Sequence, residues 1–212
     1  GRSADAKAVL CIGGGSPIDA GKSAAIILAN PGKTAEELYT FAFTPTKAVP
    51  IVVVNLTHGT GSEVNRFAVA SITKHNHKPA IAYDCLYPLF SIDDPGLMIK
   101  LSPKQTRYVS IDSVNHVIEA ATAVTANPLS ILLAGETIRL VAEYLPKALA
   151  NPEALDLYKD IPALAIGLGG AAMAQDKPLK IGVTAGPHAQ IFEQVKKVAD
   201  KQGLKIQVVE FS

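Results

Sequence analysis

Two short, uninterrupted apolar runs, each followed by a glycine-rich turn, dominate the first half of the chain. The first run covers residues 9–12 and ends in Gly-Gly-Gly-Ser-Pro at residues 13–17. The second covers residues 50–54 and leads into a turn rich in Thr and Gly at residues 57–63. Apolar runs of this length are typical of strands buried in a parallel sheet. A helix is expected directly after the first turn, over residues 18–28.

Helical patterns replace strand patterns near residue 100, after two further short strands predicted over residues 67–72 and 79–83. Ser102 is followed by a proline and, three residues later, by a glutamine, which together favour a helix start. Asn127 and the proline after it repeat that start, and helical spacing of apolar residues continues from there. The sequence therefore predicts an α/β segment followed by an all-helical one.

The last part of the chain follows a different pattern. Residues 161–174 form an uncharged run that ends in Ala-Met-Ala, the form of a signal-peptidase site. Strands are predicted over residues 179–184 and 204–211, on either side of an amphipathic helix over residues 187–202. A helix of that length allows a right-handed parallel crossover, so a β-α-β tail is expected.

The composition narrows the classes of protein to which the chain could belong. Its 212 residues include 20 Lys and Arg against 19 Asp and Glu, a balance that argues against binding to nucleic acid or to a membrane surface. No apolar run reaches the roughly 18 residues that a spanning helix needs. The two cysteines make no disulfide framework and favour a reducing compartment.

The glycine-rich turns are candidate phosphate-binding sites. A turn between a strand and a helix presents unsatisfied N–H groups at the positive end of the helix dipole. Two such turns after neighbouring parallel strands would share one edge of the sheet, where α/β proteins bind nucleotides. The first turn taken alone is equally consistent with a tight connection that binds nothing.

The segment Ser-Pro-Ile-Asp-Ala-Gly-Lys-Ser at residues 16–23 differs by one residue from the phosphate-loop pattern of nucleotide triphosphatases. Ser16 replaces the first glycine of that pattern, and Pro17 removes a backbone donor from the loop. A triphosphatase is therefore the weaker alternative.

Asp112 and His116 are candidate metal ligands. Residues four apart lie one turn apart on the same face of a helix, and Glu119 lies on that face as well. A carboxylate oxygen and an imidazole nitrogen at this spacing could share one divalent iron, zinc or manganese ion. A surface pair without a metal is the alternative, because catalytic metals usually have three or more protein ligands.

Four motifs, at residues 13–22, 57–64, 93–95 and 112–120, occur in the order and spacing of iron-containing (group III) alcohol dehydrogenases. The resemblance covers residues 1–158. It implies a partial dinucleotide-binding α/β domain with a Rossmann-like parallel sheet over residues 1–100. It also implies a partial all-α metal-binding domain over residues 101–158, and hydride transfer between an alcohol or aldehyde and NAD or NADP.

The resemblance also assigns individual residues. It implies that the cofactor contacts Gly14, Gly15, Ser16, Asp19, Thr57, Thr60, Ser62 and Lys78. It implies that Asp112 and His116 hold a divalent metal, iron by the family pattern with zinc as the alternative. The family has a further α/β portion before the segment matching Gly1 and two later metal-binding histidines, so weak metal affinity and little turnover are expected of this chain.

Residues 159–212 resemble instead the N-terminal part of the methionine-binding lipoproteins of bacterial ABC uptake systems. The sequence is therefore interpreted as a chimera, cytoplasmic in its dehydrogenase part and with a tail like that of a periplasmic lipoprotein. A periplasmic methionine-binding fragment, or a chimera without activity, is the alternative function. The edges of a truncated sheet could also lead to a homo-oligomer.

Overall fold

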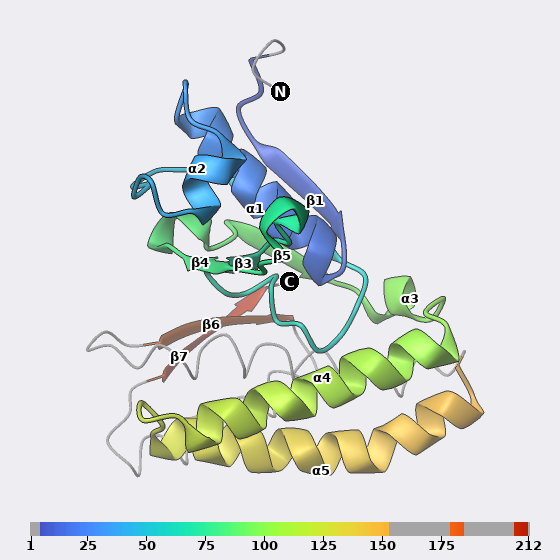
Figure 1. The fold of residues 1–212 in the computed structure, drawn as a ribbon. Helices are drawn as coiled ribbons and strands as arrows, with labels where there is room; N and C mark the ends of the chain where they lie inside the picture. Colours follow the sequence, from blue (N-terminus) through green and yellow to red (C-terminus); the bar gives the residue numbers. More distant parts are fainter. Residues whose placement is uncertain (1–4, 153–178, 185–205, 212) are drawn as a thin grey trace.

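A three-stranded parallel sheet and two long helices that lie side by side form the main elements of the computed structural model (Figure 1). The structure describes residues 5–152, 179–184 and 206–211. In chain order the elements are β1 (Val9–Gly13), α1 (Gly15–Ala29), α2 (Ala35–Tyr39), β2 (Ile51–Asn55), β3 (Phe67–Val69), η2 (Thr73–His75), β4 (Ala80–Ala82), η3 (Asp84–Leu86), β5 (Phe90–Asp93), α3 (Pro95–Met98), α4 (Pro103–Thr122), α5 (Pro128–Ala150), β6 (Leu179–Thr184) and β7 (Ile206–Phe211).

The sheet has the order β1-β2-β5, and all three strands run parallel. Gly13 pairs with Asn55, and Asn55 pairs with Asp93, so the three strands end at the same level. This register confirms that the two glycine-rich turns follow neighbouring parallel strands and leave from one edge of the sheet. β5 was not predicted, because its alternation of apolar and polar residues over four positions is too short to stand out.

Burial of the predicted strands is incomplete within the described part of the chain: β1 and β2 bury the face that packs against α1, and β5 has no fully buried residue. Cys11 and Val53 lie in the core beneath Ile18 and Ile26 of α1. On the opposite face, Leu10, Ile12, Phe90 and Ile92 are exposed. A continuous apolar run does not reveal which of its two faces is covered, since both faces read alike.

The two predicted strands at 67–72 and 79–83 form an antiparallel hairpin, β3-β4, in which each strand is shorter than predicted. Ala68 and Ile81 point into the core formed with α1. α2 was not predicted, because its five residues follow a loop rich in polar residues.

The predicted helix starts are confirmed for α4 and α5. The Ser102 hydroxyl accepts a hydrogen bond from the Gln105 amide at 3.2 Å. The Asn127 side chain accepts bonds from the amides of Leu129 and Ser130, and Ser130 completes a capping box. The helices pack through a cluster that includes Leu140, Val141 and Ala148 of α5 and Met98 of α3.

The two tail strands are confirmed. β6 and β7 pair in parallel with Leu179 opposite Ile206 and Thr184 opposite Phe211. The predicted helix over residues 187–202 and the uncharged run over residues 161–174 lie outside the described residues. Within the described ranges, no helix is both long and apolar enough to cross a membrane.

Replacing the cap of α5 tests its contribution to the helix pair. Asn127→Ala removes the acceptor of two backbone amides and should lower the free energy of unfolding by about 1 kcal/mol. Urea denaturation followed by circular dichroism measures this. Asn115→Ala, on the exposed side of α4, is the control and should change stability by less than about 0.5 kcal/mol. Equal effects of the two substitutions would contradict the role of the cap.

Candidate active site

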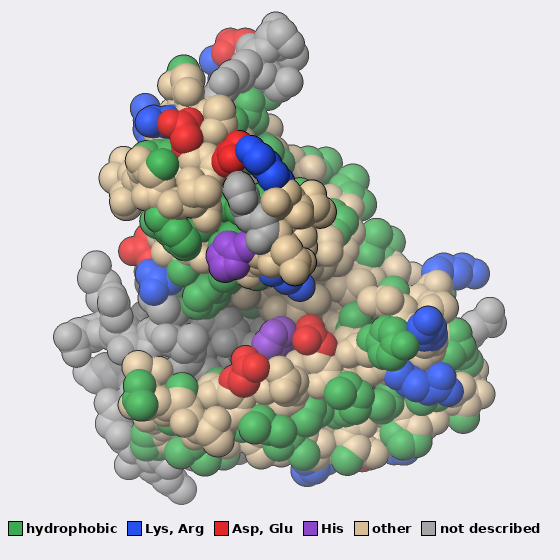
Figure 2. Space-filling view, viewed as in Figure 1, with side chains coloured by type: hydrophobic (Ala, Val, Ile, Leu, Met, Phe, Trp, Pro, Cys, Tyr) green, Lys and Arg blue, Asp and Glu red, His purple; other side chains and the backbone are tan. Residues whose placement is uncertain are grey.

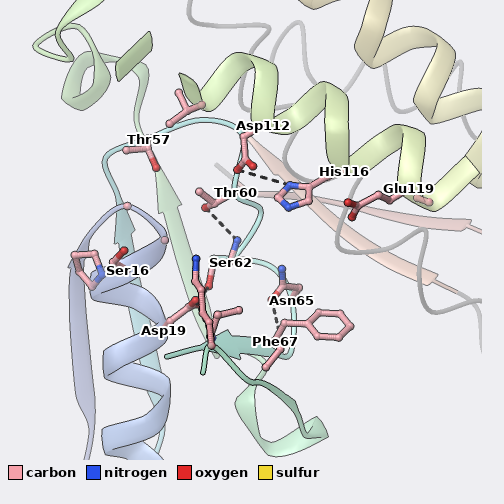
Figure 3. A pocket seen from close by; sticks show the side chains of 18 of the residues that line it. Ser16, Asp19, Thr57, Thr60, Ser62, Asn65, Phe67, Asp112, His116 and Glu119 are labelled. Atoms are coloured by element: carbon pink, nitrogen blue, oxygen red, sulfur yellow. Dashed lines mark hydrogen bonds and ion pairs between the residues drawn. The ribbon is translucent and has the colours of Figure 1, made fainter. Parts of the chain in front are cut away.

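A cavity of about 920 Å³ lies between the carboxyl edge of the sheet and helix α4. Figure 2 shows a hollow above α4 in which a histidine and acidic side chains gather. Its wall contains every residue that the sequence predicted for the site: Gly14, Gly15, Ser16, Asp19, Thr57, Thr60, Ser62, Lys78, Asp112 and His116. Figure 3 shows the polar side chains of both turns and those of α4 facing this space. The tertiary structure therefore brings the two predicted half-sites together.

The two glycine-rich turns touch each other where side chains are absent. A Cβ atom on Gly14 would lie 2.7 Å from the side chain of Thr57, and one on Gly15 would lie 3.1 Å from that of Thr60. Gly14 is the N-cap of α1 and caps it with no side-chain bond, so the first amides of the helix have no intrahelical partner. The hydroxyl of Thr57 is buried and has no hydrogen-bond partner among the described residues.

Two charged residues of α1 hold the chain that follows the second turn. The Asp19 carboxylate accepts hydrogen bonds from the Ser62 hydroxyl and the Val69 amide. The Lys22 ammonium donates to the carbonyls of Asn65 at 2.8 Å and Phe67 at 2.7 Å, and to Ser62 at 3.2 Å. Asp19 thus supports the cavity wall as well as forming part of it.

Burial is the main cause of the pKa shifts of both Lys22 and Asp19. It lowers the pKa of Lys22 to about 8, against the opposing attraction of Asp19 and Glu63. It also raises the pKa of Asp19, a shift that the bonds from Ser62 and Val69 oppose. The phosphate-loop alternative does not fit this geometry, because the Lys22 ammonium binds carbonyls behind the second turn. A phosphate-loop lysine would instead reach the phosphates of its ligand.

A buried acid, Glu63, lies at the end of the second turn, outside the residues that line the cavity. Glu63 is 1% exposed, and its carboxylate oxygens have no hydrogen-bond partner in the described part of the chain. Burial and the nearby Asp93 raise its pKa to about 8. Asp93 in turn accepts a 2.8 Å bond from the Asn55 amide group, and Asn55 accepts from the Thr57 amide at 3.2 Å. These interactions support the second turn from the sheet side.

Four buried polar or charged residues around the second turn were not predicted from the sequence: Lys22, Asn55, His58 and Glu63. A sequence signal exists for three of them, because Asn55, His58 and Glu63 are polar and lie within or just before the second glycine-rich turn, whereas Lys22 lies inside α1. Their burial depends on which elements cover them, and only the fold shows that.

Asp112 and His116 lie one helical turn apart on α4 and face the cavity, as predicted. Their nearest oxygen and nitrogen atoms, Asp112 Oδ2 and His116 Nδ1, are 3.8 Å apart. Both side chains are partly exposed, at 43% for Asp112 and 38% for His116. The next turn of the helix carries Glu119, which also lines the cavity and accepts a 2.9 Å bond from Asn115 (Figure 3). Among the described residues, no group of three or more His, Cys, Asp or Glu side chains could hold a metal ion.

A parallel sheet with polar turns at the carboxyl ends of adjacent strands is the arrangement at which α/β proteins commonly bind ligands. Residues 1–95 match the family model described as iron-containing alcohol dehydrogenase. The resemblance drawn from the first three motifs is thus confirmed, and the fourth motif, at residues 112–120, lies beyond the matched range.

Known relatives agree with this match. The chain is 60% identical over 155 residues to the long-chain primary alcohol dehydrogenase AdhA of Thermoanaerobacter ethanolicus. The aligned region covers 73% of this chain and 39% of that protein. The NADH-dependent butanol dehydrogenase A of Thermotoga maritima superposes with a TM-score of 0.75 at 27% identity, over 81% of this chain and 43% of that one. A sulfoacetaldehyde reductase of Bifidobacterium kashiwanohense, solved with NAD⁺, gives 0.75 at 28% identity, over 84% and 47%. The chain therefore spans less than half the length of each of these proteins.

The proposed likeness of residues 159–212 to methionine-binding lipoproteins finds no support in these matches. Most of that segment lies outside the described residues, and its two described strands are too common an arrangement to identify a family. The chimera stays an untested prediction.

Removing the buried ammonium tests the link between α1 and the second turn. Lys22→Met leaves the carbonyls of Asn65 and Phe67 without their donor and should lower the free energy of unfolding by about 3 kcal/mol. Chemical denaturation at pH 7 measures the loss. Lys100→Met, at an exposed position, should cost less than about 0.5 kcal/mol. A loss of similar size in both variants would refute the role of Lys22.

The raised pKa of Glu63 predicts a pH dependence of stability. Between its ordinary pKa of 4.5 and about 8, the folded protein retains a proton that the unfolded chain releases. The free energy of unfolding therefore falls as pH rises through this range, by at most about 1.4 kcal/mol per pH unit from this group. Glu63→Gln removes that contribution, so its stability relative to the wild type should rise from pH 5 to pH 8.

Denaturation curves at several pH values measure this difference. Glu36→Gln, an exposed carboxamide variant, is the control, and its stability relative to the wild type should change little with pH. A Glu63→Gln difference that stays constant from pH 5 to pH 8 would show that Glu63 is ionised in the folded protein.

Proposed function

We propose that the chain is part of a metal-dependent NAD(P) alcohol dehydrogenase, which transfers hydride between a small alcohol or aldehyde and the nicotinamide cofactor. One observation carries the proposal: a single cavity is lined by both glycine-rich turns and by the Asp112–His116 pair. A hydride-transfer enzyme needs its cofactor and its substrate-activating group in one space.

The residues of the turns fit a dinucleotide. Gly14 and Gly15 line the cavity at the start of α1, where the first helix amides have no intrahelical partner and could donate to a pyrophosphate. The unpartnered Thr57 hydroxyl is a donor that a phosphate oxygen would satisfy. Ser16, Thr60 and Lys78 add hydroxyl groups and a positive charge along the same wall.

NAD is the favoured cofactor over NADP. The butanol dehydrogenase neighbour is described as NADH-dependent, and the sulfoacetaldehyde reductase was solved with NAD⁺. Both resemble this chain over more than four-fifths of its length.

The donor set on α4 fits a divalent metal. A carboxylate oxygen and an imidazole nitrogen suit iron or zinc, and the family description favours iron. When bound, the metal would supply Lewis acidity for the substrate oxygen and the nicotinamide would supply the carbon that exchanges hydride. Asp112 and His116 would hold the metal within reach of the cofactor turns.

The remaining parts of the wall position these groups. Asp19 and Ser62 hold the second turn in place by their mutual hydrogen bond. Val109, Ala120 and Ala123 give the α4 side of the cavity an apolar lining, which limits water around a transferring hydride. In this proposal residues 1–100 are the cofactor-binding part, residues 101–158 are the metal-binding part, and residues 159–212 form a tail of unassigned role.

We also propose that the enzyme works in the cytoplasm. Cys11 and Cys85 are both free thiols, which is consistent with a reducing compartment.

Binding of NAD⁺ to the chain, measured by calorimetry, tests the proposal. Thr57→Val keeps the shape of the side chain but removes its hydroxyl, and should weaken NAD⁺ binding about tenfold through the loss of one charge-assisted hydrogen bond. Thr40→Val, on an exposed helix end, should leave the affinity unchanged. If the folded protein bound no NAD⁺, or if both variants bound it equally well, the proposal would be contradicted.

Measuring metal binding and alcohol-dependent turnover tests the expectation of weak metal affinity and low activity. With two metal ligands in its described part, the chain should bind iron or zinc weakly and reduce NAD⁺ with alcohol far below ordinary enzyme rates. Alcohol-dependent NADH formation at several turnovers per second would contradict that expectation.

A further inference from the structure

Two adjacent residues of the second glycine-rich turn, His58 and Gly59, contact helix α4, which carries the candidate metal ligands. His58 is 1% exposed, and its Nε2 lies 2.9 Å from the hydroxyl of Ser110 on α4. Gly59 has a φ of +108°, and a Cβ atom at that position would lie 2.0 Å from the carbonyl oxygen of Val109. Only glycine allows the turn to approach the helix backbone this closely.

The same contact reaches the candidate metal ligand. The carbonyl oxygen of Gly59 lies 3.3 Å from Nδ1 of His116. A carbonyl oxygen accepts hydrogen bonds and cannot donate them, so Nδ1 must carry the proton in this interaction. The other neighbour of Nδ1, the carboxylate oxygen Oδ2 of Asp112 at 3.8 Å, is also an acceptor. Both neighbours therefore favour the Nδ1–H form of the neutral ring.

We infer that the Gly59 carbonyl fixes the tautomer of His116, leaving Nε2 as the metal-binding nitrogen, and that His58 is the positioning residue that holds this carbonyl in place. The inference rests on the proposed function for its meaning, because the free nitrogen matters only if His116 binds a metal. Metal-binding histidines commonly donate their other N–H group to a carbonyl or carboxylate, which orients the ring.

His58 suits a positioning role because its environment keeps it neutral. Burial lowers its pKa to about 4, and a hydrogen bond with the Thr106 backbone only partly opposes this shift. A neutral His58 keeps one contact to Ser110 over the working pH range. Thr57 and Thr60, on either side of His58 and Gly59, line the cavity. The same turn therefore lines the proposed cofactor site and contacts α4.

The experiment measures the tautomer of His116 directly in the full chain. Long-range ¹H–¹⁵N spectra of ¹⁵N-histidine-labelled protein distinguish protonated from unprotonated ring nitrogens, and His116→Gln identifies the signals. The wild type should show the Nδ1–H form. Ser110→Ala removes the partner of His58 and should shift His116 toward the Nε2–H form that free histidine prefers.

Ser130→Ala is the matched control, because Ser130 is also a buried helical serine but caps α5 away from the turn. It should leave the tautomer of His116 unchanged. Ser110→Thr restores a hydroxyl and should restore the wild-type spectrum. If Ser110→Ala does not fold, His58→Asn tests the same contact from the turn and should give the same shift.

A second readout is Zn²⁺ affinity, measured by competition with a chelating dye. Ser110→Ala should weaken it about tenfold and Ser130→Ala should not. The Nε2–H form in the wild type, or an unchanged tautomer in folded Ser110→Ala, would overturn the inference. The tautomer result is independent of cofactor binding, so the inference can stand where NAD⁺ binding fails, and can fail where NAD⁺ binds.

Discussion

The close contact between the two glycine-rich turns is the constraint on which the rest of the site depends. Because three parallel strands end level at Gly13, Asn55 and Asp93, both turns leave the sheet at one edge. The missing side chains at Gly14 and Gly15 let Thr57 and Thr60 pack against the first turn. A side chain at either position would press against Thr57 or Thr60 and force the two turns apart.

Buried charged and polar side chains, including Lys22 and Glu63, lie near the two turns. Lys22 binds the carbonyls of the chain after the second turn, and Glu63 is buried beside the charge of Asp93. Burying such groups costs free energy unless partners satisfy them. Here the hydrogen bonds of Lys22 and Asp19 satisfy those two side chains and connect α1 to the second turn and to the chain that follows it.

The second turn also connects the α/β part with the helical part. Its hydroxyl residues face the cavity, while His58 and Gly59 contact α4 at Ser110 and Val109. Asp112 and His116 take their place relative to the sheet through this contact. A site assembled from two structural parts needs such a junction, because the proposed hydride transfer would depend on the separation of the reacting atoms to within about 1 Å.

Local signals in the sequence were enough for most elements, whereas the individual residues of the cavity wall were assigned through the family resemblance. The apolar runs predicted β1 and β2, capping residues predicted the starts of α4 and α5, and four-residue spacing placed Asp112 and His116 on one face. Short elements such as α2 and β5 were missed, since four or five residues carry too little pattern.

The sequence by itself determined the glycine-rich turns, the helix starts and the spacing of the candidate ligands, because each depends on residues a few positions apart. Only the tertiary structure decided that β1 and β5 have exposed apolar side chains in the described part of the chain, that Lys22 lies buried 43 residues from its Asn65 partner, and that the Gly59 carbonyl meets His116 across 57 positions. The physical reason is that burial and long-range hydrogen bonds depend on which elements pack together. Local spacing predicts which residues can form a site, and packing decides which of them support it.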